Sequence, residues 1–240
     1  MTEIQRFSDG DALALAGADF FVQTAVIAIA SRGKFTVALS GGSTPRNLHQ
    51  LLTREPFLSQ VDWSKVYVYW GDERTVPPDA AESNYKMARE TLLEHVPIPE
   101  VQVHRMRGEI DPEAAATEYG RLIKAHFDPP DTRFDLIFLG MGDDGHTASL
   151  FPHTAALNEV EHRCVANFVP KLDTWRITLT APVINSAANV VFLVGGASKA
   201  EALKAVIEDE YQPETYPSQL IAPEDGQLIW MVDEAAAALL

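Results

Sequence analysis

Short, continuously apolar runs recur along the chain, and the longer stretches between them have apolar residues at helical spacing. Most of these runs lack the apolar–polar alternation of a strand with one wet face, so they predict strands that are covered on both faces. We expect six such strands, over Phe35–Ser40, Val66–Trp70, Phe134–Met141, Arg176–Thr180, Val190–Gly195 and Leu228–Asp233.

The stretches between the runs predict helices. Residues 9–31 have the pattern of one long helix that ends at Gly33. Asp111 followed by Pro112 is typical of an N-cap residue and the first helical position, and an apolar stripe follows them. A similar stripe follows Ser83. Strands and helices therefore alternate along the chain.

This alternation is typical of βαβ units. We expect an α/β fold with a doubly wound, largely parallel sheet and helices on both faces. No linker, repeat or low-complexity segment interrupts residues 1–240, so we expect a single domain. Ligands of such sheets bind beyond the carboxyl ends of the strands. The loops of interest therefore follow Ser40, Trp70, Met141 and Gly195.

The net charge of −15, from 34 acidic and 19 basic residues, argues against nucleic acid and anionic membranes as partners. A phosphorylated ligand would need a local cluster of Arg and Lys. The single cysteine, Cys164, cannot form an internal disulfide. We see no secretory signal and no unbroken apolar run near the ~20 residues that span a bilayer. These features predict a cytoplasmic protein.

The first apolar run leads into Gly41, Gly42, Ser43 and Thr44, and a helix is expected to begin near Pro45. Glycines let the backbone approach an anion, hydroxyls donate to it, and free N–H groups at a helix start complete an anion site. The structural alternative is an ordinary glycine turn with a Ser/Thr cap. The position at the ligand-binding edge favours phosphate binding, although the segment is not a Walker loop.

The second run is followed by Gly71, Asp72, Glu73 and Arg74. Two carboxylates and a guanidinium at a strand end form either a solvated charged turn or part of a site. Both interpretations stay open at this point. If the turn belongs to a site, Arg74 supplies a cation that the overall charge lacks.

Residues 140–152, GMGDDGHTASLFP, are the segment richest in candidate chemistry. They contain the spacing G-x-G-x-x-G, but Pro152 follows too soon for the long helix that a dinucleotide site needs. His146 lies in a glycine-rich loop, with Asp144 two residues before it, as expected for a general base oriented by a carboxylate. The alternative is a structural loop histidine, and the position at a strand end favours the base.

Other hydrolytic chemistries lack their residues. The sequence contains no G-x-S-x-G nucleophile motif, no H-E-x-x-H and no C-x-x-C. The histidines outside the glycine-rich loop are scattered along the chain. We therefore expect no metal and no serine nucleophile.

Taken together, these segments resemble the 6-phosphogluconolactonase family over nearly the whole chain. The most specific is GDDGHTASLFP. The matching segments are LSGGSTP at 39–45, WGDERTVP at 70–77, SNYKMARETLL at 83–93, LGMGDDGHTASLFP at 139–152, RITLT at 176–180, GGASKAEAL at 195–203 and the C-terminal LIWMVDEAAA.

The resemblance implies hydrolysis of 6-phospho-D-glucono-1,5-lactone to 6-phospho-D-gluconate in the oxidative pentose phosphate pathway. It also implies no cofactor and a fold shared with glucosamine-6-phosphate deaminases. A lactone is an activated ester, so a positioned water, a base and stabilisation of the oxyanion suffice. The implied catalytic residues are His146, Asp144 and Arg74. The implied substrate- and phosphate-binding residues are Gly41, Gly42, Ser43, Thr44, Asp72, Arg176 and Lys199.

Two rival functions are less well supported. Deaminases on this fold typically carry a glutamate five residues after the motif histidine, where this chain has Phe151. Sugar-phosphate sensors add a DNA-binding domain and a basic face, which this acidic chain lacks. The sequence leaves open whether the protein is a monomer or a homodimer, which cation meets the phosphate or the ring, and what His153 does.

Overall fold

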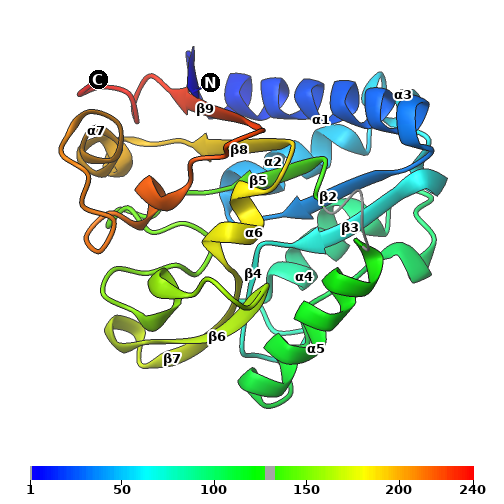
Figure 1. Ribbon diagram of the computed structural model, residues 1–240. Coiled ribbons are helices and arrows are strands. Elements are labelled where there is room, and N and C mark those ends of the chain that lie inside the picture. The colour runs from blue at the N-terminus through cyan, green and yellow to red at the C-terminus, as the bar shows by residue number, and fades with distance from the viewer. Residues whose placement is uncertain (1, 128–132) are drawn as a thin grey trace.

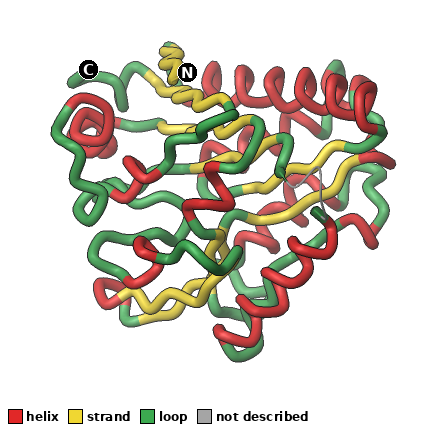
Figure 2. The backbone as a smooth tube through the Cα atoms, viewed as in Figure 1, coloured by secondary structure: helices red, strands yellow, loops and turns green. Residues whose placement is uncertain are grey.

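The computed structural model describes residues 2–127 and 133–240, and at its centre lies a six-stranded sheet in which all neighbouring strands are parallel (Figure 1). Five of the six expected strands lie in this sheet, with helices outside it (Figure 2). The strand order is β1 (Thr2–Phe7), β9 (Gln227–Asp233), β8 (Asn189–Val194), β5 (Leu136–Leu139), β2 (Phe35–Leu39) and β3 (Val66–Trp70).

Helices cover both faces of the sheet, which confirms the expected fold class. One face is covered by α1 (Gly10–Arg32), α2 (Ser43–Leu52), α3 (Phe57–Gln60) and α4 (Asn84–Ala88). The other face is covered by α5 (Pro112–His126), α6 (Ala181–Asn185) and α7 (Ala200–Glu208). Shorter helical turns are η1 (Trp63–Lys65), η2 (Arg89–Leu93), η3 (Glu100–Gln102), η4 (Ala155–Asn158), η5 (Pro170–Leu172), η6 (Ala197–Lys199) and η7 (Pro217–Leu220).

Two hydrophobic cores, one on each face of the sheet, explain the unbroken apolar runs. Successive side chains of a strand point to opposite faces. On β2, Val37 and Leu39 join the core beneath α1, whereas Ala38 joins the core beneath α5. Because both faces are dry, most positions of a central strand are apolar, and the buried Thr36 of β2 is hydrogen-bonded to Asp135.

The expected helix boundaries follow from local hydrogen bonds. Asp9 accepts hydrogen bonds from the N–H groups of residues 11 and 12, and α1 ends where Gly33 adopts a φ of 75°. Asp111 caps α5 by accepting the N–H of residue 114 at 3.0 Å. Ser83 caps α4 in the same way, although the chain widens into a π-helix after residue 88. The helix expected near Pro45 begins at residue 43.

Helix α1 is long and apolar enough to cross a membrane by length and composition, although no unbroken apolar run marks it in the sequence. Polar residues such as Asp19 and Gln23 interrupt its apolar stretches. In the structure the inner side of α1 packs against the sheet through residues including Leu13, Phe21 and Ala25. The apolar residues of this inner side serve the protein core, whereas Leu15, Val26 and Ile27 of the same helix are exposed.

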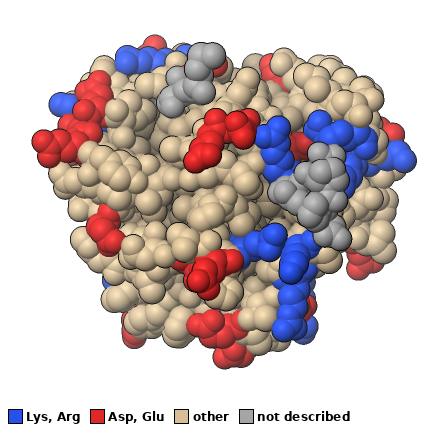
Figure 3. All heavy atoms as spheres, viewed as in Figure 1, with Lys and Arg blue, Asp and Glu red and all other residues tan. Residues whose placement is uncertain are grey.

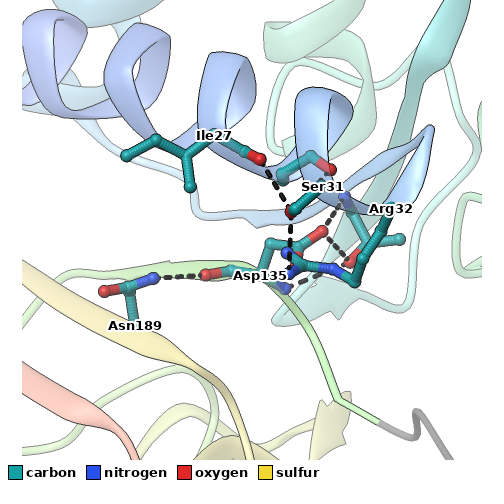
Figure 4. Close-up of polar contacts among 7 residues, drawn as sticks. Ile27, Ser31, Arg32, Asp135 and Asn189 are labelled. Carbon is teal, nitrogen blue, oxygen red and sulfur yellow. Dashed lines mark hydrogen bonds and ion pairs between the residues drawn. The ribbon is translucent and has the colours of Figure 1, made fainter.

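Asp135 ties three strands and α1 together at the amino-terminal edge of the sheet (Figure 4). Its carboxylate pairs with Arg32 at the end of α1 and accepts the Thr36 N–H at 2.8 Å and the Thr36 hydroxyl at 2.9 Å. Its carbonyl accepts from Asn189 Nδ2 at 2.8 Å. The carboxylate is buried, and these partners offset the cost of removing its charge from water.

A second, antiparallel sheet contains β4 (Asp72–Arg74), β7 (Thr174–Leu179) and β6 (Cys164–Val169), in that order. The strand expected over Arg176–Thr180 exists, but it belongs to this sheet and not to the parallel one. Only the second half of β7 is buried, a pattern that an apolar run does not reveal. The strand β1 was not expected because it is an exposed, polar edge strand.

Charged side chains are unevenly distributed on the face shown in Figure 3. Lys and Arg side chains gather on the right of this view, beside the amino-terminal ends of the strands and along α5, whereas Asp and Glu form small separate groups. The net charge of −15 is therefore compatible with local positive regions.

His49 is a buried titratable group in α2. Its side chain is 1% exposed, and Nδ1 lies 3.1 Å from the Thr91 hydroxyl. Burial, reinforced by the nearby Arg46 charge, lowers the pKa of His49 to about 3. The folded protein thus holds this imidazole neutral over a pH range in which the unfolded chain protonates it.

We predict that His49 makes the protein acid-labile. As pH falls below about 6.5, His49 becomes protonated in the unfolded chain but not in the folded chain. The free energy of unfolding therefore decreases until the pH reaches the folded-state pKa. Between pH 7.5 and 4.5 the parent should lose about 2–3 kcal/mol more unfolding free energy than His49→Gln. Urea unfolding at both pH values measures this difference. The exposed His95→Gln is the control, and equal losses in His49→Gln and the parent would contradict the prediction.

Candidate active site

The loop after β5 holds His146 in one orientation. Its Nδ1 lies 2.5 Å from Asp144 Oδ1, and its ring stacks on Phe151 with centroids 3.9 Å apart and planes 19° apart. The backbone N–H of Gly142 donates to the carbonyl of residue 146 at 2.8 Å. A Cβ at Gly142 would lie 2.0 Å from Nδ1, so only glycine lets the ring approach the backbone this closely.

Asp144 fixes which ring nitrogen of His146 carries the proton. Burial alone would raise the pKa of Asp144, but hydrogen bonds from His146 and Lys171 outweigh burial and hold that pKa well below its usual range. An ionised carboxylate can only accept, so Nδ1 carries a proton, and the lone pair of the neutral ring is then on Nε2. No hydrogen bond to Nε2 occurs within the described ranges 2–127 and 133–240. This is the arrangement of an oriented general base.

The His146 loop is held by η7 and by Tyr216, the residue just before it. Gly145 has a φ of 74°, and a Cβ there would meet the Tyr216 ring at 2.9 Å. The carbonyl of Gly145 accepts from the N–H and the hydroxyl of Ser218, at 2.9 and 2.8 Å. The base therefore lies on a loop whose backbone is anchored at two points.

Asp72 and Asn84 connect the His146 loop with the glycine loop after β2. Asp72 Oδ2 accepts from the Ser149 hydroxyl at 2.6 Å. Asn84 Nδ2 donates to the Asp72 carbonyl at 3.0 Å, and a Cβ at Gly41 would lie 2.0 Å from Asn84 Oδ1. Three loops that are distant in sequence therefore meet at one edge of the sheet. Sequence reasoning anticipated Asp72 and Gly41 as site residues but not Asn84 or Ser149.

The remaining residues of the glycine loop lie at the start of α2. Gly42 has a φ of 112° and is the N-cap residue, but no side chain caps the helix. Ser43 is exposed and Thr44 is half-buried in the first turn. Uncapped N–H groups, two hydroxyls and the positive end of the helix dipole together suit a phosphate group.

Glu73 is a buried carboxylate that sequence reasoning did not select as a site residue. It is 2% exposed and accepts the backbone N–H groups of Arg74, Asn84 and Tyr85, each at 2.8 Å, and the Ser83 hydroxyl at 3.1 Å. Burial raises the pKa of Glu73, although the three backbone donors act in the opposite direction. The carboxylate fixes the start of α4 next to β4.

Arg74 and Arg176 lie opposite one another on β4 and β7. Arg74 donates to the carbonyl of Glu82, and Arg176 donates to the carbonyl of Trp175 at 3.2 Å. Burial lowers the pKa of Arg176, and the neighbouring Arg74 charge adds to the effect. Within the described residues neither guanidinium forms an ion pair with a carboxylate. Two adjacent cations without direct counter-ions favour an anionic ligand.

Two other predicted positions stand apart. Lys199 is half-buried at the end of η6, beyond the carboxyl end of β8, and no side-chain hydrogen bond or ion pair joins it to the other site residues in the described ranges. His153 is exposed, has a φ of 58°, and donates its backbone N–H to the Glu214 carbonyl at 3.1 Å. The structure thus shows a turn-forming role for the His153 backbone.

Metal-binding side chains are not grouped in the described ranges, where no three His, Cys, Asp or Glu side chains are placed to share an ion. The site as described therefore consists of an imidazole–carboxylate pair, a glycine loop at a helix start and two arginines.

Comparison with known proteins places this chain in a family. The family model of glucosamine-6-phosphate isomerases/6-phosphogluconolactonase matches residues 8–230. A 6-phosphogluconolactonase from Synechocystis sp. is 45% identical over 213 residues, which covers 87% of this chain and 86% of the relative. One from Nostoc sp. is 39% identical over 241 residues, covering 99% and 98%. The chain therefore belongs to the glucosamine-6-phosphate isomerase/6-phosphogluconolactonase family.

Solved structures agree with this assignment. The 6-phosphogluconolactonase of Trypanosoma brucei superposes with a TM-score of 0.86 at 28% identity, covering 100% of this chain and 99% of that one. A monomeric glucosamine-6-phosphate deaminase superposes with a TM-score of 0.83 at 20% identity, covering 99% of this chain and 100% of that one, and shares the fold.

We predict that Glu73→Gln destabilises the protein. The amide places a donor where the carboxylate accepted backbone N–H groups, so at least one buried donor loses its partner. The expected cost is about 2–4 kcal/mol of unfolding free energy, measured by urea denaturation at pH 7. The exposed Glu82→Gln should change stability by less than about 0.5 kcal/mol. A Glu73→Gln protein as stable as the control would show that the N–H contacts do not hold α4.

Proposed function

We propose that the chain hydrolyses 6-phospho-D-glucono-1,5-lactone to 6-phospho-D-gluconate, with His146 as the general base and with neither metal nor cofactor. The observation that carries this proposal is the 2.5 Å contact between Asp144 and Nδ1, which leaves Nε2 for water, at the edge where the glycine loop lies. The relatives named 6-phosphogluconolactonase, which match nearly the full chain, support the choice of reaction.

The proposed reaction begins when Nε2 of His146 removes a proton from a water as its oxygen attacks the lactone carbonyl. Asp144 stabilises the imidazolium, and Arg74 stabilises the negative charge that develops on the carbonyl oxygen. The tetrahedral intermediate then collapses, and the bond between the carbonyl carbon and the ring oxygen breaks. The imidazolium returns its proton to that ring oxygen, which becomes a hydroxyl group. Water is consumed, the base is regenerated, and the new carboxylic acid releases its proton to solvent to give the gluconate.

The phosphate is proposed to bind at the start of α2, where Gly41 and Gly42 allow close approach and Ser43 and Thr44 donate hydroxyls. Arg176 and Lys199 add positive charge at the same edge of the sheet, and Asp72 orients Asn84 against the loop. Binding energy from the phosphate would orient the reacting carbonyl at the other end of the substrate.

The expected partners follow from the same proposal. The substrate is a small phosphorylated sugar lactone, and the charge of −15 disfavours nucleic acid and membrane surfaces. We propose a cytoplasmic protein that acts as a single domain over residues 1–240, as a monomer or a homodimer.

Deamination is disfavoured by the environment of the base. Phe151 stacks on the His146 ring, at the position where deaminases of this fold typically carry a glutamate. A phenyl ring cannot transfer the protons that sugar ring opening and isomerisation need. Its contact instead restricts the imidazole to one plane.

His146→Ala should lower kcat by about 10²–10⁴-fold, because a positioned base contributes that much. The lactone also hydrolyses spontaneously, so rates are measured against a blank without enzyme. His153→Asn is the matched control, since this exposed histidine lies in a left-handed turn that asparagine tolerates. A His146→Ala protein with parental melting temperature and more than about a third of parental kcat would exclude His146 as the base.

We predict that recognition of the substrate depends on its phosphate group. Unphosphorylated glucono-1,5-lactone should have a kcat/KM lower by about 10²-fold or more, because charge-assisted hydrogen bonds to the phosphate are lost. Lys199→Ala should raise KM for the phosphorylated lactone, with the exposed Lys204→Ala as control. Steady-state kinetics with both lactones measures these effects. Similar kcat/KM values for the two lactones would remove the phosphate site from the proposal.

A further inference from the structure

Lys171 contacts the acidic partner of the proposed base from a different part of the fold. It lies in η5, the turn that joins β6 to β7, and Asp173 reverses the chain there with a φ of 48°. Its Nζ lies 2.9 Å from Asp144 Oδ2, while the His146 ring occupies Oδ1 of the same carboxylate. One carboxylate is therefore shared between an imidazole and an ammonium group.

Sharing the carboxylate has two physical consequences. The contact at Oδ2 restrains rotation of the carboxylate, so Oδ1 stays aligned with Nδ1. The ammonium charge also neutralises part of the Asp144 charge and repels a second positive charge on the ring. Both electrostatic effects make the imidazolium form of His146 less favourable.

We infer that Lys171 is a positioning residue that keeps His146 neutral, and therefore able to accept a proton, at lower pH than the Asp144–His146 pair alone would allow. The inference rests on the proposed role of His146 as the base. It does not require Lys171 to touch the substrate.

Few other charged groups act on this pair in the described structure. Asp143 and Asp144 belong to the same loop as the ring, and Asp143 adds a negative charge near Lys171. Tyr216 packs against Gly145 from the segment before η7. Lys171 is therefore the cation in contact with the pair, and its side chain is 62% exposed.

The test removes the charge and follows two independent signals. In Lys171→Gln the acidic limb of the kcat/KM profile should move to higher pH by on the order of 0.5 pH unit. The NMR titration midpoint of the His146 ring, identified by the signal missing from His146→Gln, should move in the same direction by a similar amount. Because Lys171 is exposed, the difference from the parent should shrink in 1 M salt.

Two variants serve as controls. Lys171→Arg keeps a cation on the same turn and should restore the parental pH profile. Lys204→Gln removes one positive charge from the exposed side of α7 and should leave both signals at their parental positions. A purely structural role for Lys171 would change stability without moving either midpoint.

The outcomes separate this inference from the proposed function. An unmoved His146 titration in Lys171→Gln overturns the inference even when His146 is essential for activity. A raised KM with an unmoved acidic limb also overturns it and assigns Lys171 to substrate binding. Full activity of His146→Ala would instead refute the proposed function, and the NMR titration would still measure the coupling between Lys171 and the ring.

Discussion

The carboxylate of Glu73 is the constraint on which the arrangement of the site depends. It accepts three backbone N–H groups at 2.8 Å and so joins the end of β3, through β4, to the start of α4. That junction places Asn84 against both Gly41 and Asp72. A buried charge is costly unless hydrogen bonds replace its water. Four hydrogen-bond donors take the place of water here. If the start of α4 moved away, the carboxylate would become exposed or would stay buried without hydrogen-bond partners.

This acidic protein can present a site for an anionic ligand because positively charged side chains are grouped there. Arg74 and Arg176 lie side by side without a described carboxylate partner, whereas the carboxylates nearby are occupied by other donors. Asp72 is engaged by Ser149, and Asp144 is divided between an imidazole and an ammonium group. These carboxylates are therefore engaged in internal contacts, and the positive charge of the arginines stays available to a ligand.

The sequence predicted a common edge for several loops because parallel strands bring their carboxyl ends together. Loops after β2, β3 and β5 were expected there, and contacts through Asp72, Asn84 and Ser149 confirm that they meet. The pairing of Arg74 with Arg176 was not predictable in this way. It depends on β7 belonging to a second, antiparallel sheet, and an apolar run has the same appearance in either sheet.

The sequence by itself determined the alternation of strands and helices, the helix starts near residue 9, Ser83 and Asp111, and the glycines that permit close approach. These features depend on local backbone geometry and on burial of both faces of a sheet. Both constraints restrict the residue types that can occur at a position. Only the tertiary structure decided that Glu73 is an internal anchor and that Lys171 reaches Asp144. The partners of a charged side chain are set by chain segments distant in sequence, and a charged turn looks the same whether water or protein surrounds it.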